Sequence, residues 1–238
     1  MLLNIINDVS VRDVFVKKTI TRNSRQTKTL KTSPVDVMVK DAGPGRNVGL
    51  KRATVEERFS MPDHTLLYHG TSSENAASIL TYGIDLNSGK PKQNFSHKDG
   101  FYLYHDFKHA LRWAHKKHED DYAVIVFRVP NPLLDREANN GLDLRDYKDS
   151  EVLEKWKTVV RLCRTGSLYM PEWREFESFS FIQGPICINH RDMIKRNRPP
   201  RYFFLHRKVS QQLCVRTESY AEQFGDISNI CSVIFYVD

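Results

Sequence analysis

The sequence lacks the features that would assign it to a membrane, to the secretory pathway or to a disulfide-rich or zinc-binding class. No apolar run approaches the roughly 18 residues that span a bilayer. The opening decapeptide, MLLNIINDVS, has no basic residue and is interrupted by Asn and Asp, unlike a secretory signal. Cysteine is scarce and widely spaced, without a C-x-x-C pair, at Cys163, Cys187, Cys214 and Cys231. We therefore expect an intracellular protein with buried thiols, no metal and no membrane contact.

The composition indicates a folded chain with excess positive charge. Its 238 residues are 40% hydrophobic, which is enough for a sizeable core. The formal net charge of +7 permits weak attraction to nucleic acid or to acidic partners. Residues 17–31, KKTITRNSRQTKTLK, have no acidic residue and no sustained apolar period, which is typical of a mobile basic arm.

The predicted domain boundary lies near residue 64. Residues 41–61 contain AGPGRNVG and a charged stretch, which favours a linker over a core element. We therefore expect residues 1–63 to form a partly disordered basic arm and linker, and residues 64–238 to form one compact domain.

Residues 66–86, LLYHGTSSENAASILTYGIDL, predict a strand that leads directly into a helix. Residues 66–68 are the expected strand, and Thr71 with Glu74 forms a capping-box pattern that would start the helix. Gly83 is the expected C-terminal stop. His69 and Gly70 are therefore expected at the strand end, beside the start of the helix.

Residues 99–118, DGFYLYHDFKHALRWAHKKH, repeat this strand and helix arrangement. Residues 100–104 predict a strand, Asp106 an N-cap, and the apolar residues that follow recur at the i, i+3, i+4, i+7 spacing of an amphipathic helix. Trp113 falls at the edge of the apolar face, where its ring can face a cleft as well as the core.

The rest of the chain is mostly strand-like, and no internal repeat is present. Further strands are expected at 123–129, 179–188, 201–205, 211–216 and 230–237. Helices are expected at 152–163, capped by Asp149 or Ser150, and at 219–224. The basic run KRNRPPR, residues 195–201, is expected to be a loop. Short strands interleaved with a few helices indicate the α+β class.

Three motifs in this order resemble those of the ADP-ribosyltransferase superfamily, in the branch of the poly(ADP-ribose) polymerases and their mono-transferase relatives. They are Tyr68-His69-Gly70-Thr71 with its helix, Gly100-Phe101-Tyr102-Leu103 with its helix, and a late strand opening at Gln212. The resemblance covers about residues 64–238. It implies a split mixed or antiparallel sheet with flanking helices that holds extended NAD as a substrate.

The resemblance also implies roles for individual residues. His69 would bond a ribose hydroxyl, Gly70 would bond the nicotinamide amide through its backbone, and Tyr102 would stack on the nicotinamide ring. Thr71 and Gly100 complete these two NAD-binding motifs. Trp113 follows Tyr102 by the eleven positions that separate two ring-clamping aromatics in the polymerases, and an aromatic sandwich suits a flat cationic pyridinium.

The late strand departs from the polymerase pattern. A carboxylate normally opens that strand, bonds the ribose 2'-hydroxyl and stabilises the oxocarbenium-like transition state. Here Gln212 takes its place, and an amide donates a hydrogen bond without supplying negative charge. Glu218 is the acidic residue that could bend back toward the cleft. The resemblance therefore implies mono-ADP-ribosyl transfer to a macromolecular acceptor, protein or nucleic acid, with Gln212 replacing the acid.

Two alternatives remain open. The chain is also compatible with a non-catalytic module that binds NAD or ADP-ribose, because Gln212 lacks the charge that the chemistry uses. RNA 2'-phosphotransferases of the same superfamily also open with Y-H-G-T, but their second motif calls for an arginine and an H-x-H pattern. This chain reads HKDGFYLYH there, and His97 and Lys98 do not restore the pattern.

Overall fold

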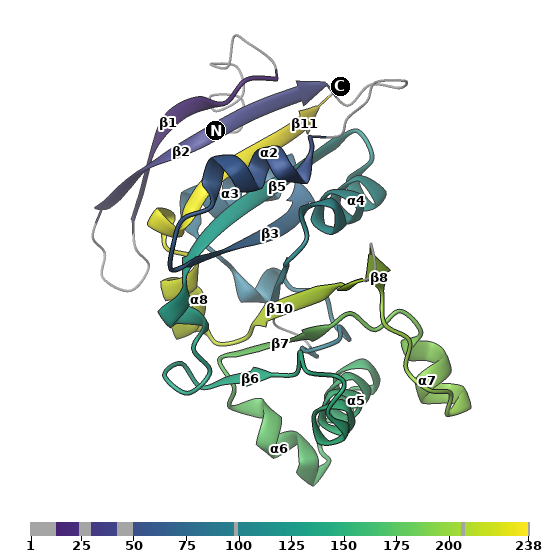
Figure 1. Ribbon diagram of the computed structural model, residues 1–238. Helices are drawn as coiled ribbons and strands as arrows, with labels where there is room; N and C mark the ends of the chain where they lie inside the picture. The colour runs from purple at the N-terminus through teal and green to yellow at the C-terminus, as the bar shows by residue number, and fades with distance from the viewer. Residues whose placement is uncertain (1–12, 24–29, 42–49, 98–99, 206–207, 238) are drawn as a thin grey trace. The chain divides into compact units, whose positions relative to one another are not determined.

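The computed structural model describes residues 13–23, 30–41, 50–97, 100–205 and 208–237. The chain divides into two compact units. The first combines the chain up to Ile84 with residues 106–131 and 222–238, and the second combines residues 85–105 and 132–221. Helices and a mixed sheet occur in the described residues, which confirms the predicted α+β class (Figure 1).

The first unit is built on five strands in the spatial order β1-β2-β11-β5-β3 (Figure 1). Neighbours pair antiparallel, except that β2 and β11 run parallel. The strands are β1 (Val16–Asn23), β2 (Leu30–Asp41), β3 (His64–Ser72), β5 (Asp121–Pro130) and β11 (Ile230–Val237). The helices are α2 (Arg52–Phe59), α3 (Ser73–Tyr82) and α4 (Phe107–His118). The apolar run of β5 is buried along almost its whole length, as expected of a central strand.

The second unit is built on four strands in the order β4-β10-β7-β6. β10 pairs antiparallel with both β4 and β7, and β6 runs parallel to β7. The strands are β4 (Phe101–Tyr104), β6 (Gly141–Asp143), β7 (Phe181–Pro185) and β10 (Gln211–Val215), and β8 (Phe204–Leu205) with β9 (Lys208–Val209) form a separate ribbon. The helices are α5 (Ser150–Thr165), α6 (Pro171–Glu177) and α7 (His190–Arg196). Helix α8 (Glu218–Phe224) then carries the chain back into the first unit.

Helix ends follow the predicted chemistry at three of four positions. The Asp106 side chain accepts a hydrogen bond from the His109 amide, and Asp149 accepts from Glu151 and Val152. Gly83 ends α3 with a φ of 85°, which a residue with a side chain rarely adopts. The capping box at Thr71 is wrong: β3 continues through His69 and Gly70, and Ser72 caps α3 by accepting from Asn75.

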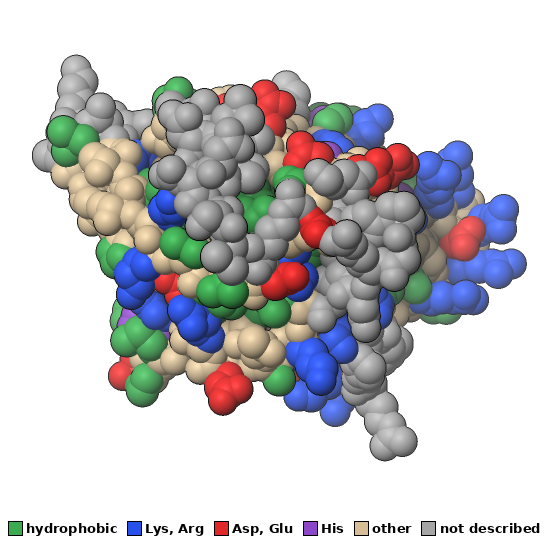
Figure 2. All heavy atoms as spheres, turned by 90° about the horizontal axis from the view of Figure 1, so that it is seen from above, with side chains coloured by type: hydrophobic (Ala, Val, Ile, Leu, Met, Phe, Trp, Pro, Cys, Tyr) green, Lys and Arg blue, Asp and Glu red, His purple; other side chains and the backbone are tan. Residues whose placement is uncertain are grey.

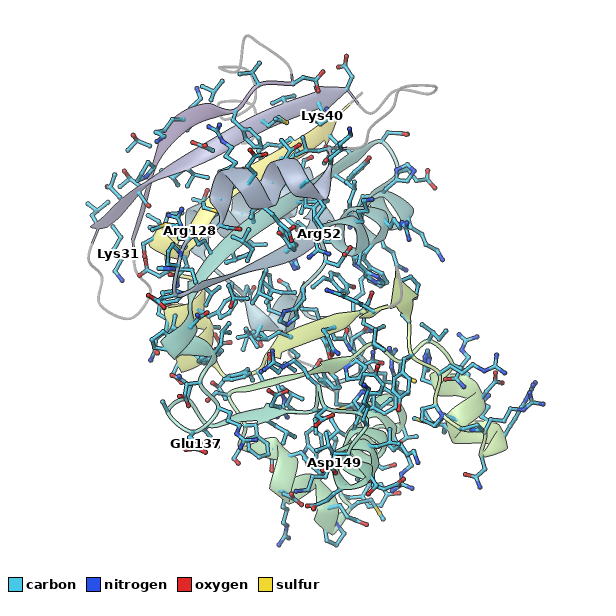
Figure 3. All side chains as sticks on the ribbon, in the orientation of Figure 1. Lys31, Lys40, Arg52, Arg128, Glu137 and Asp149 are labelled. Atoms are coloured by element: carbon cyan, nitrogen blue, oxygen red, sulfur yellow. The ribbon has the colours of Figure 1, made fainter. Side chains whose placement is uncertain are left out.

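The prediction of a mobile basic arm is wrong, because residues 16–23 and 30–41 form two paired strands. The segment between them, residues 24–29, lies outside the described residues. β2 lies between β1 and β11 and buries the largely apolar run VDVMV, residues 35–39, which the basic and Thr-rich surroundings obscured. One of the basic residues pairs with an acid of the same unit: Lys31 contacts the Asp226 carboxylate, and Figure 3 labels Lys31. The expected linker likewise contains α2.

Arg22 shows that β1 belongs to the unit. Only 8% of its surface is exposed, and its guanidinium donates to the carbonyl oxygens of Ile79 at the end of α3 and of Gly225. A charged donor that satisfies two carbonyls in this way fixes β1 against both segments.

Replacing Arg22 with Ala is expected to lower the free energy of unfolding by about 2 kcal/mol, because two carbonyl oxygens lose a charged donor. Urea unfolding of Arg22→Ala beside Lys17→Ala, which removes an exposed cation from the same strand, measures this difference. Equal stability of the two variants would contradict the conclusion that Arg22 fixes β1 to the first unit.

Candidate functional site

The candidate NAD-binding residues divide between the two units. His69, Gly70 and Thr71 lie on β3 and Trp113 on α4, in the first unit. Gly100, Tyr102 and Gln212 belong to the second, where the latter two lie on β4 and β10. The structure therefore provides two separate sets of neighbours, one for each half of the candidate site.

Gly70 lies where β3 packs against α4. A Cβ atom at this position would lie 2.2 Å from the Ala110 carbonyl oxygen and 3.1 Å from the Ala114 Cβ atom. Two residues earlier on the same face, the Tyr68 ring meets Phe107 edge-on, with 5.5 Å between ring centroids. Close approach of α4 is thus a packing reason for glycine in the motif, in addition to the backbone contact that the resemblance implies.

His69 and Thr71 point to the other face of β3, because side chains alternate along a strand. Thr71 is buried, and His69 is partly exposed. The motif therefore sends its imidazole away from α4, whereas its glycine faces that helix.

The start of α4 is fixed to α2 by charge. Arg52 Nη1 donates to the Asp106 carboxylate at 3.0 Å, and its Nε donates to Glu56 at 2.6 Å. Figure 3 labels Arg52, which belongs to α2. Asp106 thus caps α4 and holds α2 at once, which sets the position of the helix that carries Trp113.

Trp113 is partly exposed on α4, and the Lys117 ammonium lies 5.1 Å from its ring centroid. Residues four apart lie on one helix face, so this cation–π pair is local to α4. One face of the Trp113 ring is therefore covered by a cation of the same helix.

Tyr102 is anchored through its hydroxyl group. This oxygen accepts a hydrogen bond from the Phe95 amide at 2.8 Å and lies 3.1 Å from Ser96 Oγ. Burial raises the pKa of Tyr102 well above its usual value, so the phenol stays protonated. The side chain is partly exposed and packs on the core cluster that α5 and α6 contribute to.

Gly100 leaves room for this anchor. A Cβ atom there would lie 2.5 Å from Ser96 Oγ and 2.9 Å from Cys214 Sγ. A side chain at residue 100 would therefore displace the serine beside the Tyr102 hydroxyl.

Gln212 and Tyr102 share one face of adjacent strands. Gln212 lies opposite Tyr104, and Cys214 opposite Tyr102, so all four side chains are directed to the same side of the β4–β10 pair. Gln212 is only 4% exposed, and its Nε2 has no hydrogen-bond partner among the described residues. A buried amide with an unused donor is uncommon and indicates either a function or strain.

Glu218 does not replace the missing acid. It is the first residue of α8, beyond the C-terminal end of β10, whereas Gln212 is near the N-terminal end of that strand. Its side chain is exposed.

The opposite face of the same strands carries polar residues that the sequence analysis missed. His105 follows β4 and donates its amide to the Gln211 carbonyl, while Gln183 pairs with Asp143 on β6. Burial, and then the Arg145 charge, lower the pKa of His105 to about 4. In the sequence, the two adjacent glutamines at 211–212 were the signal that could have indicated these polar residues.

Comparisons with known proteins assign no family: no protein-family model, curated protein or solved structure matches the chain. Within the described residues, no group of three or more His, Cys, Asp or Glu side chains is placed to hold a metal ion. In that same part of the chain, no helix has the length and apolarity to cross a membrane. All four cysteines are buried and free, as predicted.

Gly70→Ala is expected to lower stability by about 1–3 kcal/mol, because the new methyl group must push α4 away from β3. The control is Ser78→Ala on the exposed face of α3, which should change stability by less than about 0.5 kcal/mol. Thermal or urea unfolding distinguishes them. If Gly70→Ala is as stable as the control, the packing explanation is wrong, and the backbone contact to nicotinamide that the resemblance implies would be the remaining reason for glycine.

Stability is expected to fall between pH 7.5 and pH 5. Burial lowers the pKa of His105 and of His109 to about 4, so the folded chain keeps both neutral while the unfolded chain protonates them near pH 6.5. The unfolded state then binds more protons, and each histidine lowers the free energy of unfolding by about 2 kcal/mol at pH 5. Urea unfolding across this range should show a shallower loss in His105→Gln. An unchanged slope in that variant would contradict a neutral buried imidazole.

Proposed function

We propose that this protein is an NAD-dependent mono-ADP-ribosyltransferase. The observation that carries the proposal is the shared face of Tyr102 and Gln212, two residues 110 positions apart that the β4–β10 register brings onto neighbouring strands. The motif resemblance implies that an aromatic ring for nicotinamide lies beside a side chain that bonds the ribose. The unused Gln212 Nε2 supports the second role.

In the proposed reaction the bond between the nicotinamide nitrogen and ribose C1' breaks, and nicotinamide leaves with the bonding electrons as a neutral molecule. A nucleophilic atom of the acceptor bonds to C1' and loses its proton. The motif resemblance assigns to Tyr102 the stacking on the pyridinium, and it assigns to Trp113 the role of a second ring-clamping aromatic. His69 and Gly70, with Thr71, hold the ribose and the nicotinamide amide.

Gln212 sets the limit on this chemistry. Its amide orients a ribose hydroxyl but does not stabilise positive charge at C1' as a carboxylate does. The proposal therefore includes slow turnover and no chain elongation. This neutral side chain is also the observation that favours the second candidate, a module that binds NAD without consuming it.

Nicotinamide release from NAD by the purified chain, alone and with cell lysate, tests the proposal. Tyr102→Leu, which removes the ring, should abolish release, whereas Tyr102→Phe should retain it. Because Tyr102 packs on a core cluster, Cys163→Ala is the matched control: it opens the same cluster and leaves the ring in place.

Substitutions at Gln212 test the role of charge. Gln212→Glu should raise the release rate by about tenfold or more, because a carboxylate stabilises the developing cation, and Gln212→Leu should lower it. NAD that stabilises the fold against heat without nicotinamide release would support the binding module. Neither binding nor release would overturn both candidates.

A further inference from the structure

The most basic stretch of the second unit surrounds α7. Residues 188–203, called here the basic loop, contain five basic residues and one acidic residue, a balance of +4 in a chain whose total is +7. All five basic side chains are exposed: Arg191, Lys195, Arg196, Arg198 and Arg201. In Figure 2, Lys and Arg side chains crowd the right of the view, the side on which Figure 1 draws α7.

Little of this charge is neutralised within the protein. Among the described residues, the loop takes part in one ion pair, between Arg196 Nη1 and the Asp192 carboxylate at 3.4 Å. Holding so many like charges close together costs free energy unless a partner of opposite charge binds.

The basic loop has a fixed conformation. The Asn189 side chain donates to the Pro199 carbonyl at 3.0 Å and accepts from the Arg201 amide at 2.6 Å. The Ile188 amide donates to the Arg201 carbonyl at 3.2 Å, which closes the base of the loop. The cationic side chains therefore project from an ordered backbone, which reduces the entropy lost on binding.

A row of aromatic rings begins where the loop ends. Tyr202 lies between Tyr147, at 4.7 Å between ring centroids, and Trp156, at 5.2 Å. Trp156 is fully buried and donates its Nε1 to the Pro185 carbonyl, whereas both tyrosines are partly exposed. The row thus runs from the core to the surface directly beside Arg201.

We propose that the basic loop and the Tyr147–Tyr202 pair form a docking surface for single-stranded nucleic acid. Four of the five cations are arginines, whose planar guanidinium groups bond phosphate in a bidentate manner. Partly exposed aromatic rings beside a cationic surface can stack on unpaired bases, a contact that neither an acidic protein nor an anionic lipid makes. Among the large hydrophobic residues of the loop, Ile188 is the exposed one, at 52%, and it offers too little apolar surface for membrane insertion.

Acidic residues near the rings limit the path of the strand. Burial raises the pKa of Tyr202, and the Glu154 carboxylate adds a smaller contribution in the same direction, although that carboxylate also pairs with Lys157. The phosphates are therefore expected on the Arg198 and Arg201 side, and a base on the outer face of Tyr147.

This docking goes beyond the proposed transferase activity and requires no NAD. The test measures fluorescence anisotropy of labelled 20-nucleotide oligo(dT) and oligo(U) with the full chain, without NAD, between 50 and 200 mM NaCl. The loop variant is Lys195→Gln with Arg198→Gln and Arg201→Gln. The control carries the same charge change at three exposed residues elsewhere, Lys90→Gln, Lys116→Gln and Arg174→Gln.

The loop variant should bind at least tenfold more weakly, and its slope of log K against log salt should be less steep by about 2, from about 0.7 per lost phosphate contact. The control should match the wild type within twofold. Tyr147→Leu should weaken binding about fivefold or more through lost stacking and leave the salt slope unchanged.

Three results would overturn the proposal: no binding at 50 mM NaCl, equal weakening by the loop and control variants, or equal competition by polyglutamate and by vesicles containing phosphatidylserine. Duplex DNA of the same length should compete more weakly than the single strand, because it offers no unpaired base to Tyr147. Equal thermal stability of all variants shows that a change in affinity is not a loss of fold.

Discussion

The antiparallel pairing of β10 with both β4 and β7 is the constraint on which the second unit depends. It joins three stretches that the sequence separates widely, and it fixes which side chains share a face. Tyr102, Gln212 and Cys214 lie on one face by this register alone, and His105 with Gln211 lies on the other. A slip of one residue in β10 would turn Gln212 and Cys214 away from the Tyr102 face and bring Gln211 onto it, which would bury different polar groups.

The buried polar groups of this unit differ in whether their hydrogen bonds are satisfied. The Tyr102 hydroxyl is satisfied by backbone and serine, whereas Gln212 keeps a free donor among the described residues. A satisfied group costs little to bury, and an unsatisfied one lowers stability until a ligand or a water molecule bonds it. Of these two neighbours, Tyr102 is held in position by its hydrogen bonds, and Gln212 keeps a donor without a partner among the described residues.

The sequence predicted the parts of the fold that depend on local chemistry. Caps at Asp106 and Asp149, the stop at Gly83 and the apolar run of β5 each act within a few residues, so their patterns are readable in one dimension. β2 was missed because its second partner, β11, lies far along the chain, and because basic and Thr-rich residues surround the apolar VDVMV run. β1 was missed with it, since β1 pairs with β2. The packing reason for Gly70, which depends on how α4 lies against β3, could not be predicted from spacing.

The parallel pairing of β2 with β11 has a consequence for how the chain is made. Ser232 Oγ donates to the Asp36 carbonyl across 196 residues of sequence. At about 5–20 residues per second, a ribosome takes roughly 10–40 s to reach the partner of β2 after the strand itself has emerged. Throughout that interval the apolar VDVMV segment has no parallel neighbour, and it resembles the extended hydrophobic stretches that chaperones retain. Completion of this sheet is therefore a late event in biosynthesis, and nascent chains that stall before β11 are candidates for quality control.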